Sequence, residues 1–233
     1  MSTSDPTQKE DAKNSGSLNE KISWLPIFGD SLEEQRDDTL IFKGGLIDDP
    51  TNTDDDNDSQ KSKKQGLYMS KHLFTGGTVE VKVEFEETHY FRSAEIVLSY
   101  DPRSGTELPV TLNAGIPDSQ ELFSIRQYDP QLGNWTYFVS TGNYNALRFD
   151  KLYHLLARVQ GSVVWLKVDG VVVLKKTLQK PFTQSQIGLY LASDKKITIR
   201  DFKMTNDVPK AFVIMQFSLE YQAVYFEVKC FYG

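Results

Sequence analysis

A row of carboxylates in the first half of the chain is the first candidate for chemistry. Glu80, Glu84 and Glu86 alternate with apolar residues in the segment GGTVEVKVEFEE, and Lys82 stands between the first two. Residues two apart on a strand point to the same face, so these carboxylates share one face. A glycoside hydrolase needs two carboxylates about 5–9 Å apart, one on each side of the scissile bond. The pattern is also typical of a solvated strand face, which is the interpretation we favour.

Acidic residues also gather over residues 48–64, in the run DDPTNTDDDNDSQKSKK. Calcium prefers several oxygen ligands, and an EF-hand loop has Gly at its sixth position and Glu at its twelfth. The run Asp54–Asp58 is followed by neither, and three lysines come next. The histidines show no ligand spacing: His72, His89 and His154. We therefore expect a charged loop over residues 48–64, with no bound metal and no cofactor.

Aromatic and polar side chains on later segments form a candidate ligand surface. Flat aromatic faces stack on sugar rings, and Asn, Asp and Arg side chains supply directed hydrogen bonds. The residues with these properties lie on or beside consecutive predicted strands: Asn113, Arg126, Tyr128, Trp135 and Tyr137. Trp135 and Tyr137 have the same parity on their strand, so the alternative is that they pack in the core. We predict that some of the five bind a ligand, and we predict no catalytic residue.

Residues 210–233 have the pattern of a second structural unit. Residues 211–217 form an apolar run that is long enough for one buried strand and too short for a helix. Ser218 can cap a helix whose apolar residues fall on one stripe: Tyr221, Val224, Tyr225 and Val228. A buried strand that leads into an amphipathic helix is the first half of a βαβ unit. We expect a truncated domain start here; the alternative is a last strand of the preceding domain with a terminal helix.

The elements that must position the candidate residues are strands. Besides a first ordered segment over residues 22–28, we predict strands over residues 39–43, 79–85, 94–100, 122–128, 134–140, 153–160, 162–168, 171–178, 186–192 and 196–204. Asp169-Gly170 stands between two β-branched runs and predicts a two-residue hairpin turn, in which both residues have positive φ. Many short strands separated by turn residues, with no long helical pattern, indicate an antiparallel sandwich.

Composition argues against several classes of function. The 233 residues carry a net charge of −6, and no basic stripe is present to neutralise phosphates, which argues against nucleic-acid binding. The polar N-terminus has no apolar signal segment, and no run of about 18 apolar residues could span a bilayer. The single cysteine, Cys230, rules out an intrachain disulfide framework. These features predict a cytoplasmic protein that does not bind membranes, and they leave its oligomeric state open.

The order of the strand segments resembles a known family. The GGTVEVKVEF strand is followed by AEIVLSYD, by an aromatic strand around Trp135, and then by YHLLARVQGSVVWLKVDGVVV, QIGLYLAS and KITIRDFKM. This order resembles the concanavalin A-like lectin/glucanase jelly roll in its laminin G-like variants, over about residues 22–205. Jelly rolls of this kind include lectins, glycosidases and protein-binding modules. The glucanases among them have an acidic motif with Asp between two Glu residues, whereas this sequence has Lys82 at that place.

The tail is similar to the opening of TIR-like nucleotide-binding domains related to nucleoside deoxyribosyltransferases. Those domains begin with a Phe-Val-Ile-Met-Pro-Phe strand, and residues 212–217 match it except for Gln216, which replaces the proline. The catalytic carboxylate of that family lies farther downstream, so the resemblance transfers no catalytic residue to this chain.

These observations together predict three parts. Residues 1–20 are a disordered arm, residues 21–206 are a concanavalin A-like jelly-roll domain, and residues 207–233 are the truncated start of an α/β nucleotide-binding domain. The expected fold is an all-β antiparallel jelly-roll sandwich with a short C-terminal strand-helix extension. We expect a sensor module that binds a carbohydrate or protein ligand in a bacterial signalling or defence protein, and no enzyme activity in this chain. The alternatives are a glycoside hydrolase of the same fold and a protein–protein interaction module.

Overall fold

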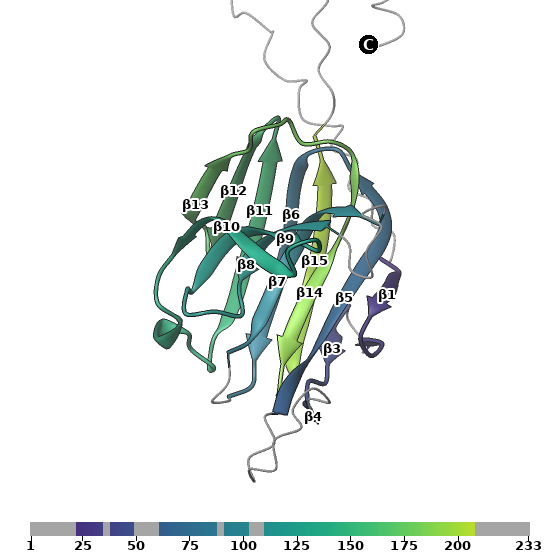
Figure 1. Cartoon of the computed structure of the whole chain (residues 1–233), viewed down its shortest axis with the longest axis vertical. Coiled ribbons are helices and arrows are strands. Elements are labelled where there is room, and N and C mark those ends of the chain that lie inside the picture. Colours follow the sequence, from purple (N-terminus) through teal and green to yellow (C-terminus); the bar gives the residue numbers. More distant parts are fainter. Residues whose placement is uncertain (1–21, 35–37, 49–60, 88–90, 103–109, 208–233) are drawn as a thin grey trace, which may run out of the picture.

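The computed structural model describes residues 22–34, 38–48, 61–87, 91–102 and 110–207. These residues form two antiparallel β-sheets that pack face to face (Figure 1). The predicted N-terminal arm, the centre of the acidic loop, and the C-terminal strand and helix lie outside the described residues. For the described part, the predicted all-β antiparallel sandwich is confirmed. No helix in this part of the chain is long and apolar enough to cross a membrane.

The first sheet, called the front sheet here, carries the candidate ligand surface. In spatial order its strands are β1 (Trp24–Phe28), β5 (Lys61–Phe74), β14 (Ser185–Ser193), β7 (Ser93–Asp101), β8 (Val110–Ile116), β9 (Phe123–Asp129) and β10 (Asn134–Thr141). The short strand β4 (Leu46–Asp48) pairs with the beginning of β5. A single 3-10 turn, η1 (Tyr144–Ala146), follows β10 in the described residues.

The second sheet, called the back sheet here, closes the other side of the core. In spatial order its strands are β13 (Val171–Thr177), β12 (Val163–Val168), β11 (Leu152–Gln160), β6 (Gly77–Phe85), β15 (Ile197–Asn206), β3 (Leu40–Phe42) and β2 (Glu33–Glu34). The predicted hairpin at Asp169-Gly170 joins β12 to β13, and both residues have positive φ, 51° and 83°. Turn chemistry visible in the sequence therefore determines this connection.

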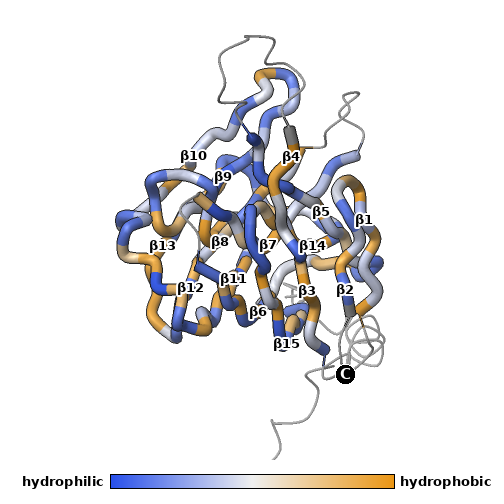
Figure 2. Tube along the Cα trace, turned by 90° about the horizontal axis from the view of Figure 1, so that it is seen from below, coloured by the Kyte–Doolittle hydropathy of each residue, from blue (hydrophilic) through white to orange (hydrophobic). Residues whose placement is uncertain are grey.

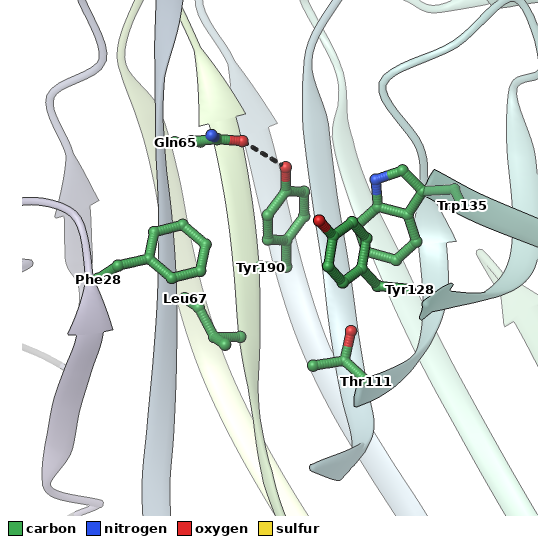
Figure 3. Close-up of a pocket in the computed structure, with 7 residues that line it drawn as sticks. All are labelled: Phe28, Gln65, Leu67, Thr111, Tyr128, Trp135 and Tyr190. Carbon is green, nitrogen blue, oxygen red and sulfur yellow. Dashed lines mark hydrogen bonds between the residues drawn. The ribbon is translucent and has the colours of Figure 1, made fainter. Parts of the chain in front are cut away.

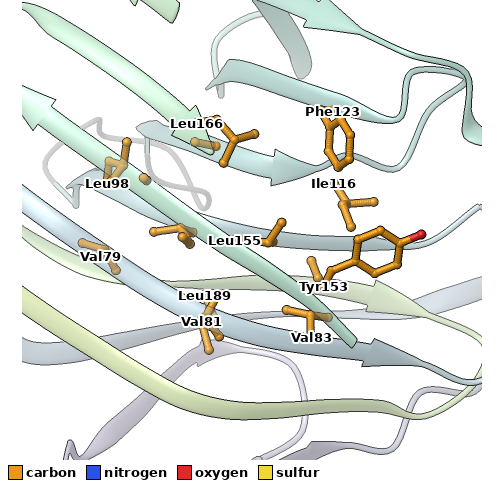
Figure 4. Packing of buried hydrophobic residues seen from close by; sticks show 14 of the residues in the cluster. Val79, Val81, Val83, Leu98, Ile116, Phe123, Tyr153, Leu155, Leu166 and Leu189 are labelled. Carbon is orange, nitrogen blue, oxygen red and sulfur yellow. The ribbon is translucent and has the colours of Figure 1, made fainter. Parts of the chain in front are cut away.

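The core lies between the sheets and follows the period of two that the sequence predicts. In β6, Val79, Val81 and Val83 are buried, and the residues between them are partly exposed. They face side chains of the front sheet such as Leu98 and Leu189 (Figure 4). The alternation of hydrophobic and hydrophilic positions is visible along most strands (Figure 2). Burial of this apolar surface is the main force that holds the two sheets together.

The short strands β2 and β4 were not predicted, and two further segments differ from the prediction. Residues 61–64 were expected to belong to a loop, but they begin β5, where Lys63 pairs with Leu46 and Lys64 pairs with Ser193. Strand β8 was not predicted, because Asn113 and Gly115 interrupt its apolar pattern. It forms nevertheless because β7 and β9 flank it and satisfy its backbone hydrogen bonds.

Candidate functional site

The five predicted ligand-binding residues lie on one face of the front sheet, the face turned away from the core. Strand pairing places Asn113 opposite Arg126, and Arg126 opposite Tyr137. The next row contains Thr111, Tyr128 and Trp135. The residues between them on the same strands, such as Leu112, Ala114 and Ile125, point into the core. The structure thus brings the five side chains together.

Trp135 and Tyr137 of β10 both face outward, because residues two apart on a strand share a face. A β-bulge follows them, where the pairing of β10 with β9 shifts register between Tyr137 and Val139. As a result, the consecutive residues Phe138 and Val139 both pack against the core. The alternative that Trp135 and Tyr137 belong to the core between the sheets is therefore wrong.

The outer face of the front sheet is curved inward at Trp135. The ring of Trp135 on β10 has its centre 5.4 Å from that of Tyr190 on β14, although three strands separate β10 from β14. In a flat sheet these two strands would lie about 19 Å apart. The curvature lets the two side chains meet over the middle of the face. Trp135 also makes an edge contact with Tyr128, with ring centres 5.2 Å apart.

A hollow of about 110 Å³ opens on this face beside the aromatic contact. Its lining consists of Phe28, Gln65, Leu67, Thr111, Tyr128, Trp135 and Tyr190 (Figure 3). None of these side chains is charged. The Tyr190 hydroxyl donates a 2.9 Å hydrogen bond to the Gln65 side-chain oxygen, which fixes both groups at the rim. Burial, together with the nearby Glu95 charge, raises the pKa of Tyr190, so its hydroxyl stays neutral at physiological pH.

A buried ion pair lies beneath Trp135. The Arg126 guanidinium donates to both carboxylate oxygens of Glu95, with the Nε–Oε2 distance at 2.9 Å, and the two side chains are 1% and 0% exposed. Ser93 donates a further hydrogen bond to Glu95. Burial is the largest single effect and lowers the pKa of Arg126, but the Glu95 charge and its hydrogen bonds together outweigh burial and raise the pKa. Arg126 is therefore held in its charged form.

Arg126 supports the aromatic residues above it. Its guanidinium carbon lies 3.8 Å from the centre of the Trp135 ring, a cation–π contact. Its Nη1 donates a 2.9 Å hydrogen bond to the Tyr137 hydroxyl. One face of the indole thus rests on Arg126, and the side chain as a whole is only partly buried. The indole also lines the hollow.

Several residues of this site were not predicted from the sequence. Tyr190 could have been found, because it alternates with core residues in the strand QIGLYLAS. Glu95 has a similar signal, since it lies between Ala94 and Ile96. Phe28 and Gln65 carry no local signal, because they enter the site only through the pairing of β1 and β14 with β5.

The candidate catalytic carboxylates on β6 lie far from the hollow. Glu80 and Glu84 point outward from the back sheet, on the opposite side of the sandwich from the hollow. The Oε2 atom of Glu80 lies 3.1 Å from Nε2 of His154, and the Oε2 atom of Glu84 lies 3.0 Å from Nη2 of Arg200. They form part of a solvated strand face, on which Glu84 makes an ion pair with Arg200 and Glu80 shares a hydrogen bond with the His154 ring. Among the described residues, no group of three or more His, Cys, Asp or Glu is placed to hold a metal ion.

Comparison with known proteins identifies the fold. No family model matches the sequence, and neither does any curated protein. Solved structures that resemble this one include a carbohydrate-binding module, CBM66, from Bacillus subtilis (TM-score 0.55, 12% identity, 77% of this chain and 92% of that one). They also include a β-glucanase from Bacillus licheniformis, with a TM-score of 0.53 and 12% identity over 83% of this chain and 96% of that one. A third is the laminarinase catalytic domain from Thermotoga maritima, with a TM-score of 0.55 and 10% identity over 84% of this chain and 96% of that one.

These similarities confirm the predicted jelly-roll sandwich, and at such low identity they show the fold alone. They also correct one expectation. We expected this chain not to be an enzyme, but most of the similar structures are glucanases, which are enzymes. The expectation was wrong because it depended on one acidic strand motif, whereas the fold as a whole is one that glycoside hydrolases use.

Proposed function

We propose that this protein binds a neutral carbohydrate in the hollow on the front sheet. The observation that carries the proposal is the group of aromatic rings from separate strands around one hollow, among them Phe28, Tyr128, Trp135 and Tyr190. Aromatic faces stack on the apolar faces of sugar rings, and the nearby hydroxyl and amide groups can bond sugar hydroxyls. The similar fold of a carbohydrate-binding module supports the same ligand class.

The size of the hollow and its uncharged lining restrict the class of ligand that it can bind. A volume of about 110 Å³ is well below the roughly 300–1,000 Å³ of pockets that enclose drug-sized ligands. The hollow therefore accommodates part of one sugar ring rather than a long buried chain. Because the lining has no charged side chain, an acidic sugar would lose hydration without gaining a partner. We expect a preference for neutral sugars over uronic acids and sulfated sugars.

The test is a glycan array followed by calorimetric titration of the best ligand. We expect Trp135→Ala to weaken binding by about 10-fold or more, in line with the loss of an aromatic anchor worth more than about 1.4 kcal/mol. Trp165→Ala is the matched control, because Trp165 lies on the back sheet beside Lys175, 5.4 Å from its Nζ. Equal binding by the two variants would contradict the hollow as the binding site. Absence of glycan binding, with capture of a defined protein instead, would favour an interaction module.

A second candidate function is hydrolysis of the bound glycan. One specific observation favours it: Glu95, a buried carboxylate, lies on a central strand of the face that carries the hollow. The next outward positions on the neighbouring strands are Tyr190 and Gly115, so a second carboxylate is not directly adjacent. The test is product release from mixed-linkage β-glucan and laminarin. Loss of turnover in Glu95→Gln with retained glycan binding would support hydrolysis, and turnover equal to wild type would exclude a role for Glu95.

The sensor role extends the proposal to the C-terminal segment. It is supported by the resemblance of residues 212–217 to the first strand of TIR-like nucleotide-binding domains. In this arrangement, glycan binding to the jelly roll controls nucleotide turnover by a TIR-like domain. The test is nucleotide hydrolysis by the protein, measured with and without the glycan found on the array. Turnover that is independent of the glycan would contradict the sensor role.

A further inference from the structure

Two polar side chains beside the hollow are buried without a hydrogen-bond partner among the described residues. Asn113 lacks a partner for both its amide nitrogen and its amide oxygen, and Ser124 lacks one for its hydroxyl. Both residues are 0% exposed. Buried polar groups are nearly always paired, because an unpaired amide or hydroxyl destabilises the fold. Two such groups on one face of one sheet therefore require an explanation.

Their position connects them to the hollow. Asn113 lies two residues from Thr111 on β8, on the same outer face, and Thr111 lines the hollow. Ser124 lies on the same face of β9, opposite Gly115, which in turn pairs with Glu95 of β7. Asn113 and Ser124 thus lie at the next outward positions along the sheet beyond Thr111.

Trp135 and the Arg126 guanidinium beneath it lie beside these groups on the outer face. The indole stacks on Arg126, the residue that pairs with Asn113, and its ring reaches across to Tyr190. Strand β10 is the last strand of the front sheet, so no neighbouring strand confines Trp135 on its outer side. A change of its side-chain rotamer would uncover the Arg126 guanidinium, which reaches across β8 to Glu95 between Asn113 and Gly115.

We infer that Asn113 and Ser124 form an inner hydroxyl-binding subsite that Trp135 gates. A neutral sugar held in the hollow inserts two adjacent hydroxyl groups when the indole moves aside; this inference rests on the proposed function. An Asn side chain offers one acceptor and two donors, which match the donors and acceptors of a pair of neighbouring hydroxyls. The Ser124 hydroxyl both donates and accepts. The Glu95–Arg126 pair next to them is internally balanced, which favours an uncharged ligand.

The first experiment separates unpartnered from structural side chains by thermal unfolding. Ser124→Ala removes an unpartnered hydroxyl, so we expect a melting temperature equal to or above that of the wild type. Ser185→Ala is the matched control, because the Ser185 hydroxyl accepts a 2.8 Å hydrogen bond from the Tyr100 N–H. We expect this control to melt below the wild type. Asn113→Leu removes both unpartnered amide groups and is expected to behave like Ser124→Ala.

The second experiment measures binding of the neutral monosaccharides glucose, galactose, mannose and fructose by calorimetry and NMR titration. We expect Asn113→Leu and Ser124→Ala to weaken binding of the sugar that the wild type prefers at least 10-fold, and Ser185→Ala to leave it unchanged. A Trp24→Phe, Trp165→Phe double variant leaves Trp135 as the single tryptophan. Its fluorescence should shift on sugar binding if the indole moves. Ser124→Ala removes one atom and keeps the test decisive if Asn113→Leu does not fold.

The outcomes are distinguishable. If Ser124→Ala and Asn113→Leu melt as far below the wild type as Ser185→Ala, the two side chains have structural partners and the inner subsite is overturned. If both variants bind the sugar with wild-type affinity, the inner subsite is overturned and binding in the outer hollow stands. If Trp135 fluorescence does not respond to a sugar that binds, the gate is overturned. If the wild type binds none of the four sugars and no glycan on the array, the proposed function fails together with this inference.

Discussion

The guanidinium of Arg126 lies under the indole of Trp135, 3.8 Å from the centre of its ring, and supports it from within the sheet. Glu95 in turn holds Arg126 through two hydrogen bonds. The exposed part of the candidate site is thus positioned by a buried charge pair. Under the proposed function, these three residues couple the stability of the fold to ligand binding.

Removal of the Glu95 charge should destabilise the fold strongly. Glu95→Gln leaves the buried Arg126 charge without compensation, and breaking a buried pair in this way costs about 3–5 kcal/mol. Urea unfolding measures the change in the free energy of unfolding. Glu84→Gln is the control, because the Glu84–Arg200 pair is about half exposed and should be worth less than about 1 kcal/mol. Equal effects of the two substitutions would contradict the structural role of the Glu95–Arg126 pair.

The hydroxyl of Tyr190 should contribute to both folding and binding. Tyr190→Phe keeps the ring in the hollow but removes the hydrogen bond to Gln65, so the amide at the rim loses its orientation. We expect the free energy of unfolding to fall by about 0.5–1.5 kcal/mol. Glycan affinity should fall by about 3- to 10-fold, and calorimetry measures this. Wild-type affinity in Tyr190→Phe would show that the Gln65 amide does not contact the ligand.

The charge of Asp169 should stabilise the hairpin between β12 and β13 in a pH-dependent way. Partial burial raises the pKa of Asp169, but hydrogen bonds from the His154 N–H and the Lys151 ammonium outweigh burial and lower it below its ordinary value. A carboxyl group whose pKa is lower in the folded state stabilises the fold above its unfolded pKa. This contribution is lost as the pH falls through the folded pKa.

Asp169→Asn tests this contribution, because Asn also tolerates positive φ and keeps an acceptor for the N–H. We expect the variant to be less stable than the wild type at pH 7 by under about 1 kcal/mol, since the group is partly exposed. The difference should shrink below about pH 4 and vanish near pH 2. Urea unfolding at these three pH values checks it, and a constant difference would show that the charge is not responsible.

Gly188 should be intolerant of any side chain. It lies on β14 between β5 and β7, and a Cβ atom there would come within 2.2 Å of the Tyr68 carbonyl oxygen. Backbone cannot move aside cheaply, so we expect Gly188→Ala to cost about 1–3 kcal/mol. Gly133→Asn is the control, because no atom lies within 4 Å of a Cβ there and Asn tolerates its positive φ. Thermal unfolding compares them, and equal melting temperatures would contradict the close approach at Gly188.

Much of the fold was predictable because it depends on local patterns. The alternation in β6 and the Asp169-Gly170 turn are consequences of side-chain period and of backbone conformation at single residues. Strand β8 was not predictable in this way, because Asn113 and Gly115 are poor strand formers. Its neighbours β7 and β9 supply the hydrogen bonds that override this preference.

In the candidate site, too, some features follow from local sequence pattern and others from tertiary contacts. The sequence by itself determined which residues of β9 and β10 share a face, because the parity of Arg126, Tyr128, Trp135 and Tyr137 depends only on spacing along two strands joined by a short turn. Only the tertiary structure decided that Tyr190 meets Trp135 and that Glu95 pairs with Arg126, 31 residues away. Those contacts depend on the order and inward curvature of the strands, and sheet order is set by packing of the whole sandwich rather than by any one segment.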